Sequence, residues 1–155
     1  MQIVGEKGIG KILKVLLQIC FWAGIILLIV IPFIINQYGF SLGGSMFVIY
    51  PNGIVLLIIT HNFIKLFNSL RLNNPFCKEN VKILKATSIV SLIGSVLWLI
   101  DFLYETILAK SSDIILNSTL VFLCILFFGV SIALYIISEL IKQATEYKQE
   151  NELTI

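Results

Sequence analysis

Few residues of this chain have side chains that could do chemistry, and one pair of them stands out. His61 is the only histidine, and Asn62 follows it inside a long apolar segment. An ionisable group inside such a segment is a candidate functional residue, so we take His61 and Asn62 as a candidate polar site near the inner membrane boundary. A structural role is the alternative that we favour. His61 lies about two helical turns from the polar end of its segment, where Asn62 or lipid headgroups can hydrogen-bond with it.

Acidic and sulfur-containing residues offer two further candidates. Asp101 and Glu105 stand four residues apart, hence on one helix face, where two carboxylates can bind a cation. A solvated helix end explains the same pair, and we prefer this simpler interpretation. The three cysteines form no C-x-x-C pair, and only Cys77 suggests palmitoylation or metal binding, which we do not favour.

Motifs of known enzyme classes are absent from the sequence. The chain has no H-E-x-x-H, no G-x-S-x-G and no phosphate-binding loop. A pair of Cys77 and His61 would require a loop to fold against a helix, and nothing in the sequence selects that geometry. We therefore predict a protein that is not an enzyme and that has no catalytic residue, cofactor or metal ion.

The composition shows which elements must position these residues. Of the 155 residues, 58% are hydrophobic and 13% are charged, and the mean hydropathy is +0.99. Soluble domains have about a quarter charged residues, so insertion into a bilayer is the simplest explanation. Four segments are long enough to cross a hydrocarbon core of about 30 Å, namely 12–35, 48–67, 81–103 and 114–137. We predict an all-α membrane protein with a single domain, 1–155. Its four transmembrane helices form an up-down bundle, and the tail 138–155 extends helix four into the cytoplasm as an amphipathic helix.

The positions of lysine and arginine predict the orientation in the membrane. If both termini are cytoplasmic, Lys110 is the only one of the 11 basic residues that lies outside. Cytoplasmic loops are enriched in these residues, so the pattern predicts a plasma-membrane protein with both termini inside. The basic residues then lie at the membrane interface, and no surface for direct nucleic-acid binding is implied.

Small polar residues recur along the predicted third helix. Thr87, Ser91 and Ser95 are spaced by four residues, with Gly94 beside them. Such a face lets helix backbones approach closely and lets hydroxyl groups bond to backbone carbonyls. We favour helix packing over the alternative, a polar transport path, since no carboxylate accompanies these residues at mid-membrane.

Two segments of the sequence resemble a known family. The stretch N-P-F-C-K-E-N-V, residues 74–81, joins the predicted helices two and three, and S-E-L-I-K-Q-A-T-E-Y-K-Q-E-N-E-L-T-I, residues 138–155, ends the chain. Both resemble segments of the YoaS-like family of small bacterial four-helix membrane proteins of unknown function, and the resemblance covers essentially the whole chain. It implies a bacterial membrane protein without an established activity. Members are often encoded beside a small helix-turn-helix transcription regulator, which the resemblance therefore implies as a candidate partner.

These two segments lie on the predicted cytoplasmic side and form our candidate interaction surface. We expect Phe76 to pack against Leu140 or Ala144. We also expect Glu79 and Asn80 to receive hydrogen bonds from the tail. The candidate surface consists of Pro75, Phe76, Glu79, Asn80, Glu139, Gln143, Asn151, Leu153, Thr154 and Ile155.

The tail favours a role in protein binding. Glu139 is expected to pair with Lys78, Lys82 or Arg71. Residues 149–155 are expected to be strand-like with an apolar end, so that they add to a partner's sheet edge or groove. The alternative is that the tail folds back on its own loop. We predict a non-enzymatic multi-pass membrane protein with a protein-binding or regulatory cytoplasmic face. Its candidate partners are the lipid bilayer, a small helix-turn-helix regulator and a second copy of the chain.

A small transporter or ligand-binding membrane protein is the second function class. In such a protein Ser95, Asp101, Asn117 and Thr119 would surround an outward-facing cavity. The absence of inverted repeats with broken helices counts against a transporter.

Overall fold

The computed structural model of the chain describes residues 9–38, 46–71, 76–108 and 114–153, and these residues are almost entirely helical. Four α-helices make up the fold: α1 (Ile9–Tyr38), α2 (Met46–Arg71), α3 (Lys78–Leu103) and α4 (Ile114–Leu153). A short π-helix, η2 (Tyr104–Leu108), continues α3. The predicted all-helical class is confirmed for the described part of the chain.

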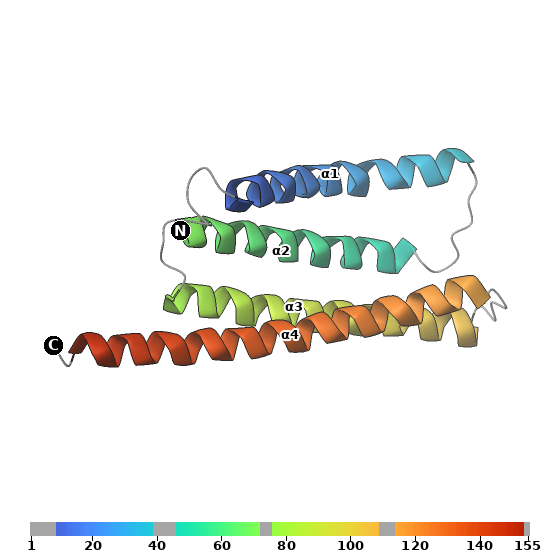
Figure 1. The fold of residues 1–155 in the computed structure, drawn as a ribbon. Coiled ribbons are helices and arrows are strands. Elements are labelled where there is room, and N and C mark those ends of the chain that lie inside the picture. Colours follow the sequence, from blue (N-terminus) through green and yellow to red (C-terminus); the bar gives the residue numbers. More distant parts are fainter. Residues whose placement is uncertain (1–8, 39–45, 72–75, 109–113, 154–155) are drawn as a thin grey trace.

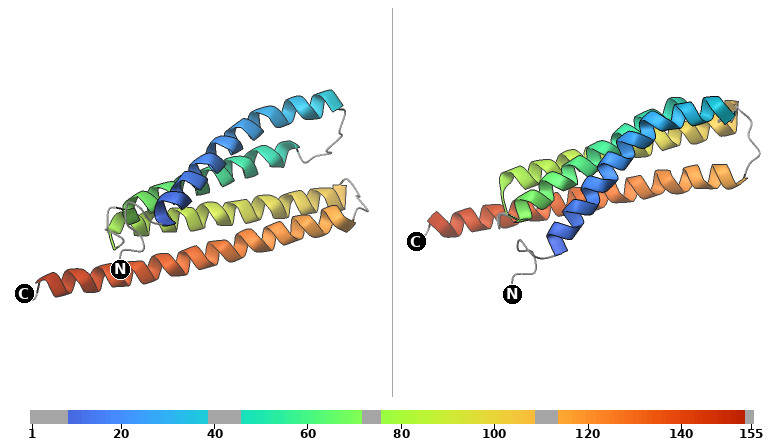
Figure 2. Two further views of the ribbon diagram at one scale, coloured as in Figure 1. Left: turned by 45° about the horizontal axis from the view of Figure 1, so that its top comes forward. Right: turned by 90° about the horizontal axis from the view of Figure 1, so that it is seen from above.

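The four helices lie side by side in the order of the chain (Figure 1). α3 packs most extensively on α4, while α2 packs on α3 and α1 packs on α2. Within the described residues α1 and α4 share no comparable contact, so the helices form an open row. The first turns of α1 and α3 and the last turns of α2 and α4 lie at one end of this row (Figures 1 and 2). We call it the terminal end, and the opposite end the far end.

Three of the described helices are long and apolar enough to cross a membrane. These spans are Ile12–Ile31, Lys78–Ile107 and Ile114–Glu150. Their large apolar side chains face outward, as the exposed fractions of Trp22 (64%) and Ile125 (65%) show. Apolar surface on this scale suits lipid and not water, which indicates a membrane protein. The predicted span 48–67 on α2 is not among these three spans of the described residues.

α2 and α3 both begin before the membrane spans predicted for them. Pro51 lies inside α2, whose first residue is five positions earlier. A proline this close to a helix start removes only one backbone hydrogen bond, so the helix tolerates it. α3 begins at Lys78, three residues before the predicted membrane span 81–103. The backbone of Cys77 is extended, and its carbonyl accepts the N–H of Asn80 at 3.1 Å, which closes the first turn.

Small polar residues make the contact between α3 and α4. Three hydroxyl groups donate hydrogen bonds across it to backbone carbonyls: Ser91 to Phe127 (2.9 Å), Ser95 to Cys124 (3.0 Å) and Ser131 to Ser88 (2.8 Å). All four serines are less than a tenth exposed. We call these four serines the α3–α4 seam. The packing role predicted for this face of α3 is confirmed.

Gly94 lies where α2, α3 and α4 meet. A Cβ atom at this position would lie 2.8 Å from the ring of Phe127 on α4 and 2.9 Å from Val55 on α2. Real Cβ atoms do not approach other atoms so closely, so both neighbours would have to move. The glycine therefore lets three helices approach at one level.

Replacing Gly94 by alanine should destabilise the protein by about 1–3 kcal/mol, the usual effect of overpacking a filled core. Gly129→Ala in α4 is the matched control, since no described atom lies within 4 Å of the position that its Cβ would take. The measurement is thermal unfolding of both variants in the same detergent. A Gly94→Ala protein as stable as the Gly129→Ala protein would contradict the three-helix contact.

Candidate interaction surface at the terminal end

The terminal end brings the start of α3 against the last part of α4. A cleft of about 220 Å³ lies between them, lined by Lys78, Val81, Lys82, Lys142, Thr145 and Glu146. One turn further along α3, the ammonium group of Lys85 lies 5.8 Å from the centre of the Tyr135 ring on α4, within reach of a cation–π interaction. The two motif segments of the sequence therefore meet at this end.

Neighbouring residues in the first turn of α3 face different helices. Lys78, Val81 and Lys82 are three and four residues apart, so they share the helix face toward α4. Glu79 and Asn80 instead line a second cavity of about 510 Å³, together with residues from the last turns of α2. Both residues therefore lie on the side of α3 that faces α2.

The predicted surface residues differ widely in exposure. Phe76 is 46% exposed, which leaves nearly half of its surface open even if it touches Leu140 or Ala144. Asn80 is fully buried, whereas Gln143 is exposed. Asn151 and Leu153 lie in the last turn of α4, while Pro75, Thr154 and Ile155 lie outside the described residues.

Glu139 forms a different ion pair from the expected one. Its carboxylate lies 3.1 Å from the Nζ of Lys142, one turn along the same helix, and not against Lys78 or Lys82. A spacing of three residues places both side chains on one helix face, so Lys142 is the nearest cation. Because the pair is exposed, it contributes little to stability and does not hold α4 to α3.

Residues 149–153 are helical, where a strand-like peptide was expected, and they continue the predicted extension of the fourth helix. α4 is one continuous helix of 40 residues that ends at Leu153. The backbone N–H groups of residues 149–153 donate within the helix to carbonyls one turn earlier. This segment therefore presents a helix end and not a free strand edge.

The other candidate residues lie at a contact between two helices or in buried positions. The His61 ring lies 5.9 Å, centre to centre, from the Phe21 ring of α1. Asp101 and Glu105 were expected at a solvated helix end, but they are only 3% and 7% exposed. Asp101 lies seven residues after Gly94, about two turns, and so falls on the buried face of α3. Within the described residues no group of three His, Cys, Asp or Glu side chains could hold a metal ion.

No role was predicted for Asn52 or Trp98, yet both line a cavity of about 400 Å³ between α1 and α2. Asn52 is only 2% exposed. The sequence feature that could have indicated this cavity is Asn52, a single amide within an apolar stretch. Because Asn52 follows Pro51, it resembled part of a helix start.

Comparison with known proteins gives one match. The model of the family described as "Protein of unknown function (DUF2975)" matches residues 10–155, a range that contains both motif segments, 74–81 and 138–155. No curated protein and no solved structure matches the chain. Since the family model covers almost the whole sequence, this chain belongs to the DUF2975 family of proteins of unknown function.

Proposed function

We propose that this chain is a non-enzymatic multi-pass protein of the bacterial plasma membrane whose terminal end faces the cytoplasm and binds another protein. The observation that carries the proposal is the projection of α4 beyond the other helices at this end (Figures 1 and 2). Glu146 still lines the cleft with the first turns of α3. From there α4 continues to Leu153, about 10 Å further at roughly 1.5 Å per residue.

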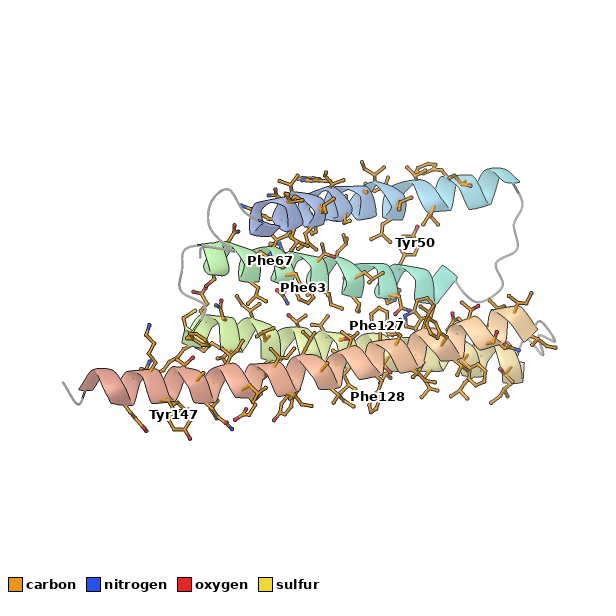
Figure 3. All side chains as sticks on the ribbon, viewed as in Figure 1. Tyr50, Phe63, Phe67, Phe127, Phe128 and Tyr147 are labelled. Carbon is orange, nitrogen blue, oxygen red and sulfur yellow. The ribbon has the colours of Figure 1, made fainter. Side chains whose placement is uncertain are left out.

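The projecting part of α4 presents a large aromatic side chain. Tyr147 is 67% exposed. It points away from the other helices, as does Phe128, whereas Phe127 points toward them (Figure 3). Tyrosine is enriched among the residues that dominate binding at protein interfaces. A helix that carries such an anchor docks by lying in a groove of its partner.

Charge supports the cytoplasmic orientation of this end. The basic side chains at the start of α3 and along the last part of α4 are Lys78, Lys82, Lys85, Lys142 and Lys148. Basic residues that flank membrane spans favour the cytoplasmic side. The same orientation requires α2 to cross the membrane together with the other three helices, because the start of α1 and the end of α4 lie at one end of the row (Figure 1).

The family resemblance offers a first partner to test. Genes of the YoaS-like family often lie beside the gene of a small helix-turn-helix regulator, so sequestration of such a regulator at the membrane is the specific form of the proposal. Self-association is the competing form, since α1 exposes apolar side chains such as Trp22 and Phe33 that a second copy can cover.

Two of the residues that favoured a transporter, Ser95 and Thr119, are used in helix packing or in their own helix. The Ser95 hydroxyl donates to the carbonyl of Cys124 across the seam. The Thr119 hydroxyl donates to the carbonyl of Ile115 on its own helix. The observation that still favours ligand binding is the separate cavity between α1 and α2.

The orientation can be tested by cysteine labelling. In a variant whose three cysteines are replaced by alanine, a cysteine introduced as Gln149→Cys should react with a membrane-impermeant maleimide only after the cells are opened. A cysteine introduced as Ile114→Cys at the far end, where the native side chain is 81% exposed, should react in intact cells. Labelling of the Gln149→Cys variant in intact cells would contradict the cytoplasmic terminal end.

Partner binding can be tested by purifying the tagged chain from its native membrane in mild detergent, followed by mass spectrometry. A truncation after Glu146 and the variant Tyr147→Ala should each reduce recovery of the partner at least about tenfold, the scale of a lost interface anchor.

Phe122→Ala is the matched control, because Phe122 is 62% exposed on the same helix but lies within the predicted membrane segment 114–137, far from the projecting part of α4. It should leave the recovery unchanged. Equal recovery with and without residues 147–155 would refute binding through the projecting helix. Recovery of the chain alone, as a dimer, would favour self-association instead.

A further inference from the structure

The cavity between α1 and α2 has the properties of a lipid-ligand site. Its volume of about 400 Å³ falls within the range of small-molecule sites, roughly 300–1,000 Å³. Along α2 it extends from Asn52 to Thr60, a distance of about 12 Å at roughly 1.5 Å per residue. Two of its lining residues, Leu27 and Leu56, are about half exposed, so the cavity opens on the outer surface of the helix row.

Two glycines shape the walls of the cavity. A Cβ atom on Gly53 of α2 would collide with the Leu28 side chain of α1. A Cβ atom on Gly24 of α1 would lie 3.0 Å from the Leu57 side chain of α2. These contacts hold α1 close to α2 at two levels, and both glycines line the cavity.

Unpaired polar atoms mark one end of the cavity. Among the described residues, neither the Nδ2 nor the Oδ1 atom of Asn52 has a hydrogen-bond partner, and the Nε1 atom of Trp98 has none either. The Asn52 side chain is 98% buried, since its exposed fraction is 2%. Buried polar groups in native proteins are nearly always paired, and an unpaired one is destabilising by about 1–3 kcal/mol. These atoms therefore need a partner that the described helices do not supply.

The chemistry of the lining restricts that partner. Asn52 offers one donor and one acceptor group, and Trp98 offers a further donor, which together match a hydroxyl or carbonyl group. No charged side chain lines the cavity, so a phosphate or carboxylate would lack a counter-charge. The Thr60 hydroxyl at the other end already donates to the carbonyl of Leu56 at 2.8 Å. That end is therefore suited to an alkyl chain.

We propose that this cavity binds a single-chain amphiphile with an uncharged, hydroxylated head group, of the monoacylglycerol type, which enters sideways from the bilayer. The head group lies at Asn52 and Trp98, and the chain runs along α2 toward Thr60. At about 30 Å³ for each water-sized group, the cavity holds roughly a dozen non-hydrogen atoms, so the rest of a longer chain remains in the lipid. This proposal does not depend on protein binding at the terminal end.

The test is photo-crosslinking of the full-length protein in nanodiscs with a monoacylglycerol that carries a diazirine in its acyl chain. The matching fatty acid and the matching unsubstituted hydrocarbon, each with the same diazirine, serve as comparison probes. We expect the monoacylglycerol to label peptides of α1 and α2 around the cavity at least about tenfold more efficiently than either comparison probe, the scale of one lost hydrogen bond or more.

Two variants and one control make the test specific. Asn52→Leu and Trp98→Phe should each reduce labelling by the monoacylglycerol about tenfold while thermal unfolding without the probe shows stability equal to or above that of the original chain. Thr60→Val is the control, because Thr60 lines the cavity but its hydroxyl is already paired, so labelling should not change.

Equal labelling by all three probes would mean that ordinary acyl chains fill the cavity, and it would overturn the proposal. Unchanged labelling of the Trp98→Phe variant would do the same. If the Asn52→Leu protein is unfolded, the native Asn52 amide must have hydrogen-bond partners within the protein or in bound water. That result would also refute the role of Asn52 as the head-group anchor.

Discussion

The fold depends on how two helices associate inside lipid. The hydrocarbon chains of lipids are as favourable an environment for apolar side chains as the surface of another helix. Burying such side chains between helices therefore gives little driving force for association. The α3–α4 seam meets this constraint with serine hydroxyls that bond to backbone carbonyls of the opposite helix. Gly94, which has no side chain, also lets the Phe127 ring of α4 lie close to the backbone of α3. Many large apolar side chains, which would form the core of a soluble protein, face outward instead.

The seam also determines what the two ends of the molecule can do. Because α3 holds α4 along its membrane part, the last turns of α4 project from the terminal end as a supported helix with Tyr147 exposed. α1 is attached at the opposite edge of the row, mainly through α2. That weaker attachment, with glycines at its contacts, leaves the cavity that contains Asn52 and Trp98. The proposed protein-binding surface and the proposed lipid site therefore lie in different parts of the molecule.

The sequence predicts what depends on local pattern and misses what depends on tertiary packing. Long apolar runs predicted the helices, and the spacing of Ser91 and Ser95 predicted a packing face. The burial of Asp101 and Glu105 was missed, because the buried face of α3 is polar and the apolar pattern that marks a core in water does not mark it here. The helical extension of the fourth helix was predicted, but the strand-like character expected for residues 149–155 was wrong for the described part, which is helical up to Leu153. Extending an existing helix adds one hydrogen bond per residue without a new nucleation step, which outweighs a weak local preference.

The most direct test of the seam is the stability in lipid of a chain in which Ser91, Ser95 and Ser131 are all replaced by alanine. Interhelical hydrogen bonds in membranes average about 0.6 kcal/mol, so the loss of three should destabilise the protein by roughly 2 kcal/mol. Ser118→Ala is the reference, because the hydroxyl of Ser118 donates only to the carbonyl of Ile115 on its own helix. It should leave stability unchanged. A triple variant as stable as the reference would show that forces other than the serine hydrogen bonds hold α3 to α4, which would contradict the central role of the seam.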